Sequence, residues 1–168
     1  HALLSPPAVQ WIDKSPNTEL AVLCELPARP KCPEQFTEVG DSCYYLGNSA
    51  IDWNAAQDYC SILAPNGKLV ELETLEEMYL VQDFLNENGD SSRAYWTGAE
   101  EQGRNDEYFW ASSGKPVIIT NWYSGYSPDS GTDDAVYLLD GSYRRRWNDL
   151  PKSYIGVYEL CEADPADL

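Results

Sequence analysis

Residues 51–63 read IDWNAAQDYCSIL. In this stretch Trp53, Ala56, Cys60 and Leu63 are three or four positions apart, so in an α-helix all four lie on one face. The stretch therefore predicts an amphipathic helix whose apolar face, including the Cys60 side chain, points into the protein core.

The residues that follow predict a second helix and then a change of architecture. The sequence TLEE from Thr74 offers a capping box with Glu77, and the apolar periodicity ends near Gly89. From residue 95 to residue 162, short aromatic and β-branched segments alternate with Gly, Ser, Asn and Asp, which indicates short strands and long loops. Two helices followed by a strand-rich half predict an α+β fold.

Upstream of the first helix, residues 32–46 read CPEQFTEVGDSCYYL. Cys32 and Cys43 flank a turn at Gly40 and Asp41, which predicts a β-hairpin closed by a local disulfide.

Length and charge limit the kinds of partner. The chain of 168 residues suits one main domain, and 28 acidic against 11 basic residues give a net charge of -17 and a pI near 4.1. This charge would repel nucleic acid, and the sequence has no apolar run long enough to span a bilayer. Cations or neutral polar ligands are the better candidates.

Cysteine and histidine usage indicates a secreted binding protein rather than an enzyme. Cysteines occur at five positions without CxxC spacing, namely Cys24, Cys32, Cys43, Cys60 and Cys161. Four cysteines plus one are typical of an extracellular, disulfide-bonded domain. The single histidine, His1, stands at the end of the sequence, which disfavours histidine acid-base catalysis and most zinc sites.

Eight short motifs occur in one order between Cys32 and Glu162. They are CPEQF with CYY, WNAAQDYC, LVELET, WTGA, FWASSGKPV, the dipeptide NW, SPD with WND, and a terminal LCE. Together they resemble the long form of the C-type lectin-like domain. The resemblance implies an α+β fold of two helices, two small antiparallel sheets and a long ligand-binding loop.

The resemblance also implies a disulfide pattern. It pairs Cys60 with Cys161 and leaves Cys24 outside the domain, free to pair with another chain. Most lectins of this kind carry a further disulfide at the positions of Ala135 and Lys152, so the binding loop here lacks that clamp.

The segment YSPDSGTDDA at 126–135 and the later WND match the calcium site of sugar-binding members of the family. The metal ligands that the resemblance implies are Asp129, Asp133, Asn148 and Asp149, with Asp134 close by. Sugar hydroxyls would complete the Ca²⁺ coordination, contacting Ser127, Tyr126 and the same Asp129, Asp133, Asn148 and Asp149. Carboxylate and amide oxygens are the ligands that Ca²⁺ prefers.

Several features leave alternatives open. Ser127 stands where the family has Glu or Gln, which lowers the expected calcium affinity, and SPDSGTDD is also a typical solvated turn. Glu100 and Glu101 with Asp106 are weaker candidates for an accessory calcium site.

Two other groups of residues have a simpler structural interpretation. Trp53, Trp96, Trp110, Trp122 and Trp147 are predicted to pack in the core. The run of three arginines at 144–146 is predicted to pair with acids at the surface rather than to bind an anion.

The N-terminal segment repeats the end of the domain. W11IDKSPNTELAVLC24 resembles W147NDLPKSYIGVYELC161, with Trp-to-Cys intervals of 13 and 14. We therefore divide the chain into the tail of an upstream lectin-like domain with its linker (1–31), a lectin-like domain (32–162) and a C-terminal tail (163–168).

Two functions are compatible with these motifs. The first is calcium-dependent binding of a carbohydrate or glycoprotein ligand. The second is a structural module of a tandem array, in which chains self-associate through residues 1–26.

Overall fold

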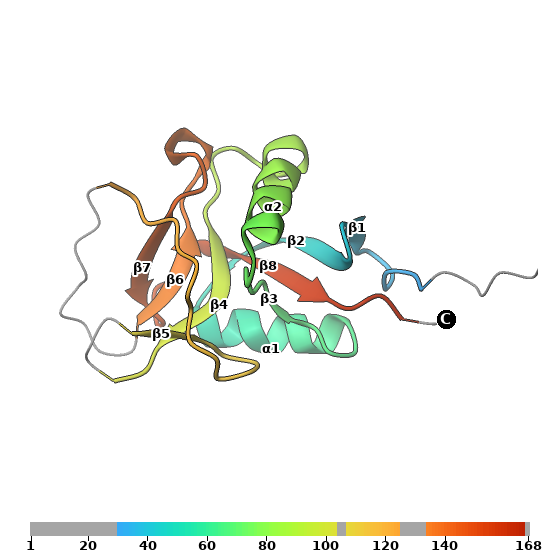
Figure 1. The fold of residues 1–168 in the computed structure, drawn as a ribbon, viewed down its shortest axis with the longest axis horizontal. Helices are drawn as coiled ribbons and strands as arrows, with labels where there is room; N and C mark the ends of the chain where they lie inside the picture. The colour runs from blue at the N-terminus through green and yellow to red at the C-terminus, as the bar shows by residue number, and fades with distance from the viewer. Residues whose placement is uncertain (1–29, 104–106, 125–133, 167–168) are drawn as a thin grey trace, which may run out of the picture.

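A computed structural model describes residues 30–103, 107–124 and 134–166. The elements, in chain order, are β1 (Thr37–Val39), β2 (Ser42–Ile51), α1 (Trp53–Leu63), β3 (Lys68–Leu69), α2 (Leu75–Asn88), β4 (Tyr95–Glu101), β5 (Tyr108–Trp110), β6 (Asp134–Leu138), the 3-10 helix η1 (Gly141–Tyr143), β7 (Trp147–Pro151) and β8 (Val157–Ala163). Two helices and a strand-rich second half confirm the α+β prediction (Figure 1).

The strands of this described part form one sheet with the order β1-β2-β8-β4-β6-β7, to which β3 and β5 add at β8 and β4. Every pairing is antiparallel except one, the parallel contact of Tyr95 in β4 with Tyr158 in β8. The two antiparallel groups that we expected are therefore present but joined at this contact into a single mixed sheet.

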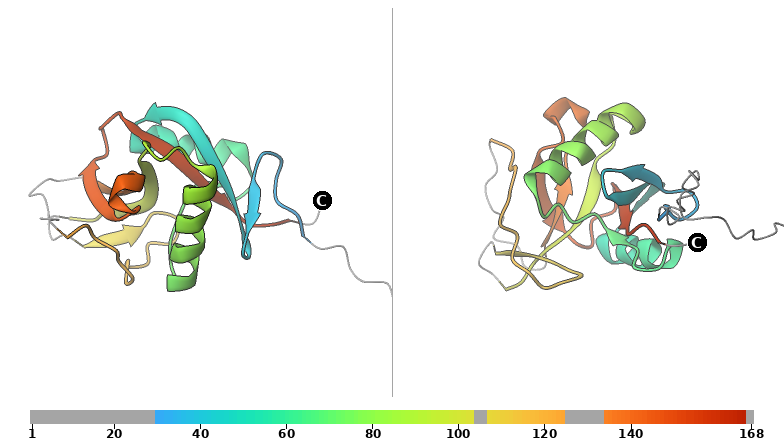
Figure 2. Two further views of the ribbon diagram at one scale, coloured as in Figure 1. Left: turned by 90° about the horizontal axis from the view of Figure 1, so that it is seen from above. Right: turned by 45° about the vertical axis from the view of Figure 1, so that its right-hand side comes forward.

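The two helices pack on opposite faces of the sheet. In β8, Leu160 belongs to a core cluster with Met78 and Val81 of α2, whereas its neighbour Cys161 belongs to a second cluster with Ala56 and Cys60 of α1. Alternate residues of a strand point to opposite faces, so a single strand contributes to both clusters. Figures 1 and 2 show α1 and α2 separated by the strands, and both ends of the described chain on the side away from β6 and β7.

Helix α1 begins directly after a capping residue, Asp52. The Asp52 side chain accepts a hydrogen bond from the Ala55 amide and caps the helix. Trp53, Ala56 and Cys60 are buried, which confirms the predicted apolar face.

Helix α2 also has the predicted cap. The Thr74 hydroxyl accepts from the Glu77 amide, and the Glu77 carboxylate accepts from the Glu73 amide. Leu75 is more exposed than its periodicity suggests, whereas Phe84 is buried.

Two disulfides connect the ends of the domain to its core. Cys32 bonds to Cys43 beside the β1–β2 hairpin, and Cys60 of α1 bonds to Cys161 of β8. Both predicted pairings are confirmed. Cys24 lies outside the described residues, as does all of the segment 1–26.

The tryptophan prediction is also confirmed. Trp53, Trp96, Trp110 and Trp147 are buried, and Trp122 is half-buried against the core. Among the residues that the structure describes, no helix is long and apolar enough to cross a membrane.

The prediction that all three arginines pair with acids at the surface was wrong. Among the described residues none of the three forms an ion pair, and Arg145 is only 1% exposed. Its guanidinium donates to the backbone carbonyls of Arg93 and Asp90 and lies 5.5 Å from the ring centre of Tyr95. Charge patterning along the chain did not reveal this, because the acceptors are backbone atoms more than 50 residues away.

Candidate functional site

Strands β6 and β7 place two of the predicted ligands on the same face of the sheet. Val136 is opposite Asp149 in the register, and Asp134 is opposite Pro151. Asp134 and Val136 share one face because they are two positions apart. Asp134 and Asp149 are therefore diagonal neighbours, exposed by only 1% and 6%.

A third acid lies beside them on β4. Glu100 is opposite Ala135, so continuing this register places Glu101 next to Asp134. Glu101 is 6% exposed. Three carboxyl side chains from three adjacent strands thus lie on one face of the sheet; we call Glu101, Asp134 and Asp149 the acidic face.

Tyr108 and the first part of the long loop cover this face. The Tyr108 hydroxyl donates to Asp149 Oδ2 at 2.7 Å, and its ring packs against Trp122. The loop is attached to β7 by two hydrogen bonds, from the Trp147 amide to the Asn121 carbonyl and from the Tyr123 amide to the Trp147 carbonyl. The ring contact and these bonds hold residues 121–123 beside β7.

Asn148 does not join the acidic face. Its side chain donates to the Tyr137 hydroxyl at 3.3 Å, and Tyr137 packs edge-on against Trp96 in the cluster that faces α1. Burial raises the pKa of Tyr137, so this hydroxyl stays protonated at neutral pH. The structure therefore places the predicted ligands Asn148 and Asp149 on opposite faces of β7.

Where the resemblance suggests a missing disulfide, the structure has an ion pair. Ala135 is buried on the α1 face, and Lys152 Nζ lies 2.7 Å from Glu100 Oε2 and 4.9 Å from the ring centre of Trp53. Because Glu100 is the register partner of Ala135, this contact connects β4 to the end of β7. At the position where the resemblance implies a disulfide in most relatives, this chain thus has the noncovalent contact between Lys152 and Glu100.

The remaining predicted site residues lie outside the described part. These are Tyr126, Ser127, Asp129, Asp133 and, for the accessory site, Asp106. Within residues 30–103, 107–124 and 134–166, no three His, Cys, Asp or Glu side chains are arranged to hold a metal ion by themselves. A calcium site on the acidic face therefore needs ligands from the neighbouring segments.

Sequence reasoning did not identify Tyr108 as part of the site, and it did not combine Glu101 with Asp134 and Asp149. Glu101 and Asp134 are 33 positions apart in the sequence and meet only through the pairing of β4 with β6. The β5 sequence YFW is aromatic throughout and gave no signal for Tyr108; only the structure shows that Tyr108 and Trp110 are buried and Phe109 between them is less so.

A second group of acids lies at the start of α2. The Glu162 carboxylate accepts from the Glu71 amide at 3.0 Å and lies 4.0 Å from Lys68 Nζ. Burial raises the pKa of Glu162 to about 7, although Lys68 acts in the opposite direction. The Tyr44 hydroxyl donates to Glu77 nearby, and burial raises the pKa of Glu77 as well.

This raised pKa predicts a pH-dependent stability. The folded protein holds the Glu162 proton more tightly than the unfolded chain, whose glutamates titrate near 4.5. The contribution to stability is thus complete below about pH 4.5 and is lost as the pH rises through 7, a loss of about 3 kcal/mol. Urea unfolding of Glu162→Gln should depend less on pH between 5 and 8 than the wild type.

The matched control is Glu76→Gln, which changes an exposed acid at the same helix start. Its pH dependence should follow the wild type. Parallel curves for the wild type and Glu162→Gln would contradict the assignment.

Comparisons with known proteins agree with this architecture. The family model of the lectin C-type domain matches residues 49–163. The mouse low affinity immunoglobulin epsilon Fc receptor is 30% identical over 132 residues, which are 78% of this chain and 37% of the receptor. The chain thus spans little more than a third of that relative's length.

Solved structures give the same result. The crystal structure of human lithostathine is similar with a TM-score of 0.68 and 28% identity, covering 84% of this chain and 96% of that chain. The cow C-type carbohydrate-recognition domain of CD23 follows with a TM-score of 0.67 and 27% identity, covering 83% and 100%. The family match to more than half of the sequence establishes that the chain belongs to the C-type lectin domain family.

Proposed function

We propose that the chain is an extracellular, non-catalytic binding module that recognises carbohydrate or glycoprotein ligands with the help of Ca²⁺. The observation that carries the proposal is the acidic face, in which Glu101, Asp134 and Asp149 gather on adjacent strands beneath the long loop. Carboxylate oxygens are the ligands that Ca²⁺ prefers, and the strand pairing brings three such side chains to one face of the sheet.

The donor set suits calcium in part. Ca²⁺ takes six to eight hard oxygen ligands and tolerates irregular geometry. Asp134 and Asp149 would hold the ion together with Asp129 and Asp133 of the adjoining segment. Asn148, whose side chain is on the other face, would have to reorient to take part.

The ion would present open positions to the vicinal hydroxyls of a sugar, while the carboxylates accept hydrogen bonds from those hydroxyls. The similar domain of cow CD23 was solved in the presence of a GlcNAc2Man3 oligosaccharide. That likeness supports a carbohydrate as the ligand class for this chain.

Calcium should stabilise the fold, because a ligand that binds only the folded state adds RT ln(1 + [L]/Kd) to the unfolding free energy. This is about 2.7 kcal/mol at a hundredfold excess over Kd. Differential scanning calorimetry in calcium and in chelator measures the effect. We expect a higher midpoint in calcium, a smaller rise with magnesium, and no calcium response in Asp149→Asn.

Tyr108→Phe is the matched control, because it removes the hydrogen bond to Asp149 but leaves the carboxylate. This variant should keep the calcium response. Equal midpoints for the wild type in calcium and chelator would reject the metal site.

Self-association through residues 1–26 is the second proposed function. β1 is at one edge of the sheet, and Pro30 lines a cavity with Glu38 and Gly40 beside that edge. An edge strand can accept a further strand from another chain. Light scattering of the full chain and of a variant without residues 1–30 tests this proposal. If both proteins were monomers, self-association through residues 1–26 would be excluded.

A further inference from the structure

The turn between β6 and β7 carries two arginines that differ from most other basic residues, Arg144, which is exposed, and Arg146, which is half-buried. Lys68, Arg93, Lys115 and Lys152 each lie within 4.0 Å of a carboxylate oxygen. In the part of the chain that the structure describes, Arg144 and Arg146 form no such ion pair. Lys31, at the start of the described residues, likewise forms none, so what distinguishes the turn is that two such arginines lie close together.

The backbone of the turn is held in a costly conformation. Arg144 and Arg145 have φ angles of 58° and 55°, in the left-handed region that residues other than glycine rarely adopt. The buried guanidinium of Arg145 bonds to the Arg93 and Asp90 carbonyls and thereby fixes the turn. Arg145 therefore holds the turn in place, and the backbone positions of its neighbours Arg144 and Arg146 are fixed.

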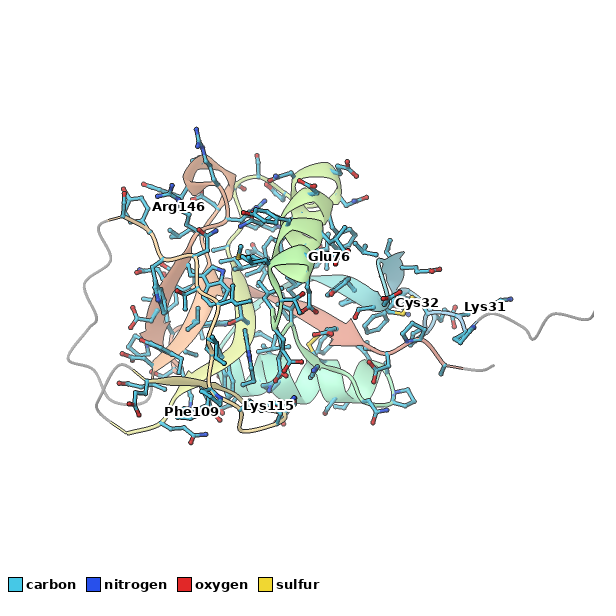
Figure 3. All side chains as sticks on the ribbon, in the orientation of Figure 1. Lys31, Cys32, Glu76, Phe109, Lys115 and Arg146 are labelled. Atoms are coloured by element: carbon cyan, nitrogen blue, oxygen red, sulfur yellow. A yellow bond between two sulfur atoms is a disulfide. The ribbon has the colours of Figure 1, made fainter. Side chains whose placement is uncertain are left out.

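Two tyrosines stand next to these arginines. The rings of Tyr123 and Tyr143 meet edge to face with centroids 5.4 Å apart, yet remain 39% and 45% exposed. The Arg146 amide donates to the Tyr143 carbonyl at 3.2 Å, which connects the tyrosine pair to the arginines. Figure 3 labels Arg146 at this turn.

We propose that Tyr123, Tyr143, Arg144 and Arg146 form a subsite for an acidic saccharide, one that carries sulfate or carboxylate groups. The guanidinium fork matches the planar oxygens of these groups, and an exposed tyrosine ring can pack against the apolar face of a sugar. The choice of a saccharide rests on the proposed function, because Tyr123 belongs to the long loop for which we propose carbohydrate binding. Its amide attaches that loop to the Trp147 carbonyl of β7.

The overall negative charge does not prevent this binding. Interactions between exposed charges are largely screened beyond about 8 Å at physiological salt, so the charges of the turn itself matter most. There the three arginines at 144–146 outnumber the one acid, Asp140, which caps the 3-10 helix. An acidic surface of a second copy of this chain is the competing occupant. The tyrosine pair favours the saccharide.

The test compares tetrasaccharides that differ in charge. Biolayer interferometry would measure the full chain against chondroitin 4-sulfate, unsulfated chondroitin, which has carboxylates only, and neutral chitotetraose, each in calcium and in chelator. We expect an acidic tetrasaccharide to bind at least about tenfold more tightly than chitotetraose. The difference between the two chondroitins assigns sulfate or carboxylate as the recognised group.

The double variant Arg144→Asn/Arg146→Gln should lose that preference, and its thermal midpoint should match the wild type because asparagine tolerates the left-handed backbone. Lys115→Gln removes an exposed charge elsewhere and should keep the preference for the acidic tetrasaccharide. Three results would overturn the subsite. They are an equal loss of the preference in both variants, no preference in the wild type, and an effect of the substitutions on the association state alone, measured by light scattering. If the preference persisted in chelator and the neutral tetrasaccharide bound equally in calcium and in chelator, the subsite would stand while the calcium proposal failed.

Discussion

Removing the Cys60–Cys161 disulfide should cause a large loss of stability. The two cysteines are 101 positions apart, so the disulfide restricts a long loop in the unfolded chain. In the chain-entropy model such a restriction is worth up to about 4.7 kcal/mol. We expect the Cys60→Ala/Cys161→Ala variant to approach this loss in urea unfolding under non-reducing conditions.

The other disulfide gives the matched comparison. Cys32 and Cys43 are 11 positions apart, for which the same model gives only about 2–3 kcal/mol. A Cys32→Ala/Cys43→Ala variant should therefore be clearly more stable than the first variant. Equal losses would show that loop length does not govern the contribution of these disulfides.

Replacing Arg145 should also be strongly destabilising, unlike replacing its neighbours. Arg145→Met keeps most of the side-chain volume but leaves the carbonyls of Arg93 and Asp90 without this donor. A fully buried acceptor that loses its partner costs about 1–3 kcal/mol. Because both bonds are only part-buried, we expect a total of about 2–4 kcal/mol, below the upper limit for two fully buried acceptors. Thermal and urea unfolding measure it.

Arg146→Gln is the control for this prediction. It changes a half-buried arginine one position away, and surface substitutions usually stay within about 0.5 kcal/mol. If Arg145→Met were equally mild, the buried guanidinium would not be holding the turn.

Local sequence patterns were sufficient for the helices and the hairpin. The spacing of Trp53, Ala56 and Cys60 and the cap at Thr74 depend only on neighbouring residues, so they could be predicted directly. The Cys60–Cys161 pairing needed the family resemblance, because spacing alone does not select among the possible connections.

The arrangement of the candidate site could not be predicted in the same way. Whether Asp149 faces Val136 and Asn148 faces Tyr137 depends on the register of β6 with β7, and a shift of one residue would exchange the two faces. The burial of Arg145 likewise depends on carbonyls of the segment before β4. Motifs therefore indicated which acids to consider, and strand pairing decided which of them meet.

Glycan binding with and without calcium tests the central claim most directly. The full chain and Asp149→Asn would be applied to a panel of neutral and acidic glycans, once in calcium and once in chelator. The proposed function predicts that the wild type binds at least one neutral glycan in calcium, that chelator abolishes this binding, and that Asp149→Asn weakens it at least about tenfold. Binding of equal strength in chelator, or an unchanged affinity in Asp149→Asn, would contradict the claim that calcium on the acidic face recognises the sugar.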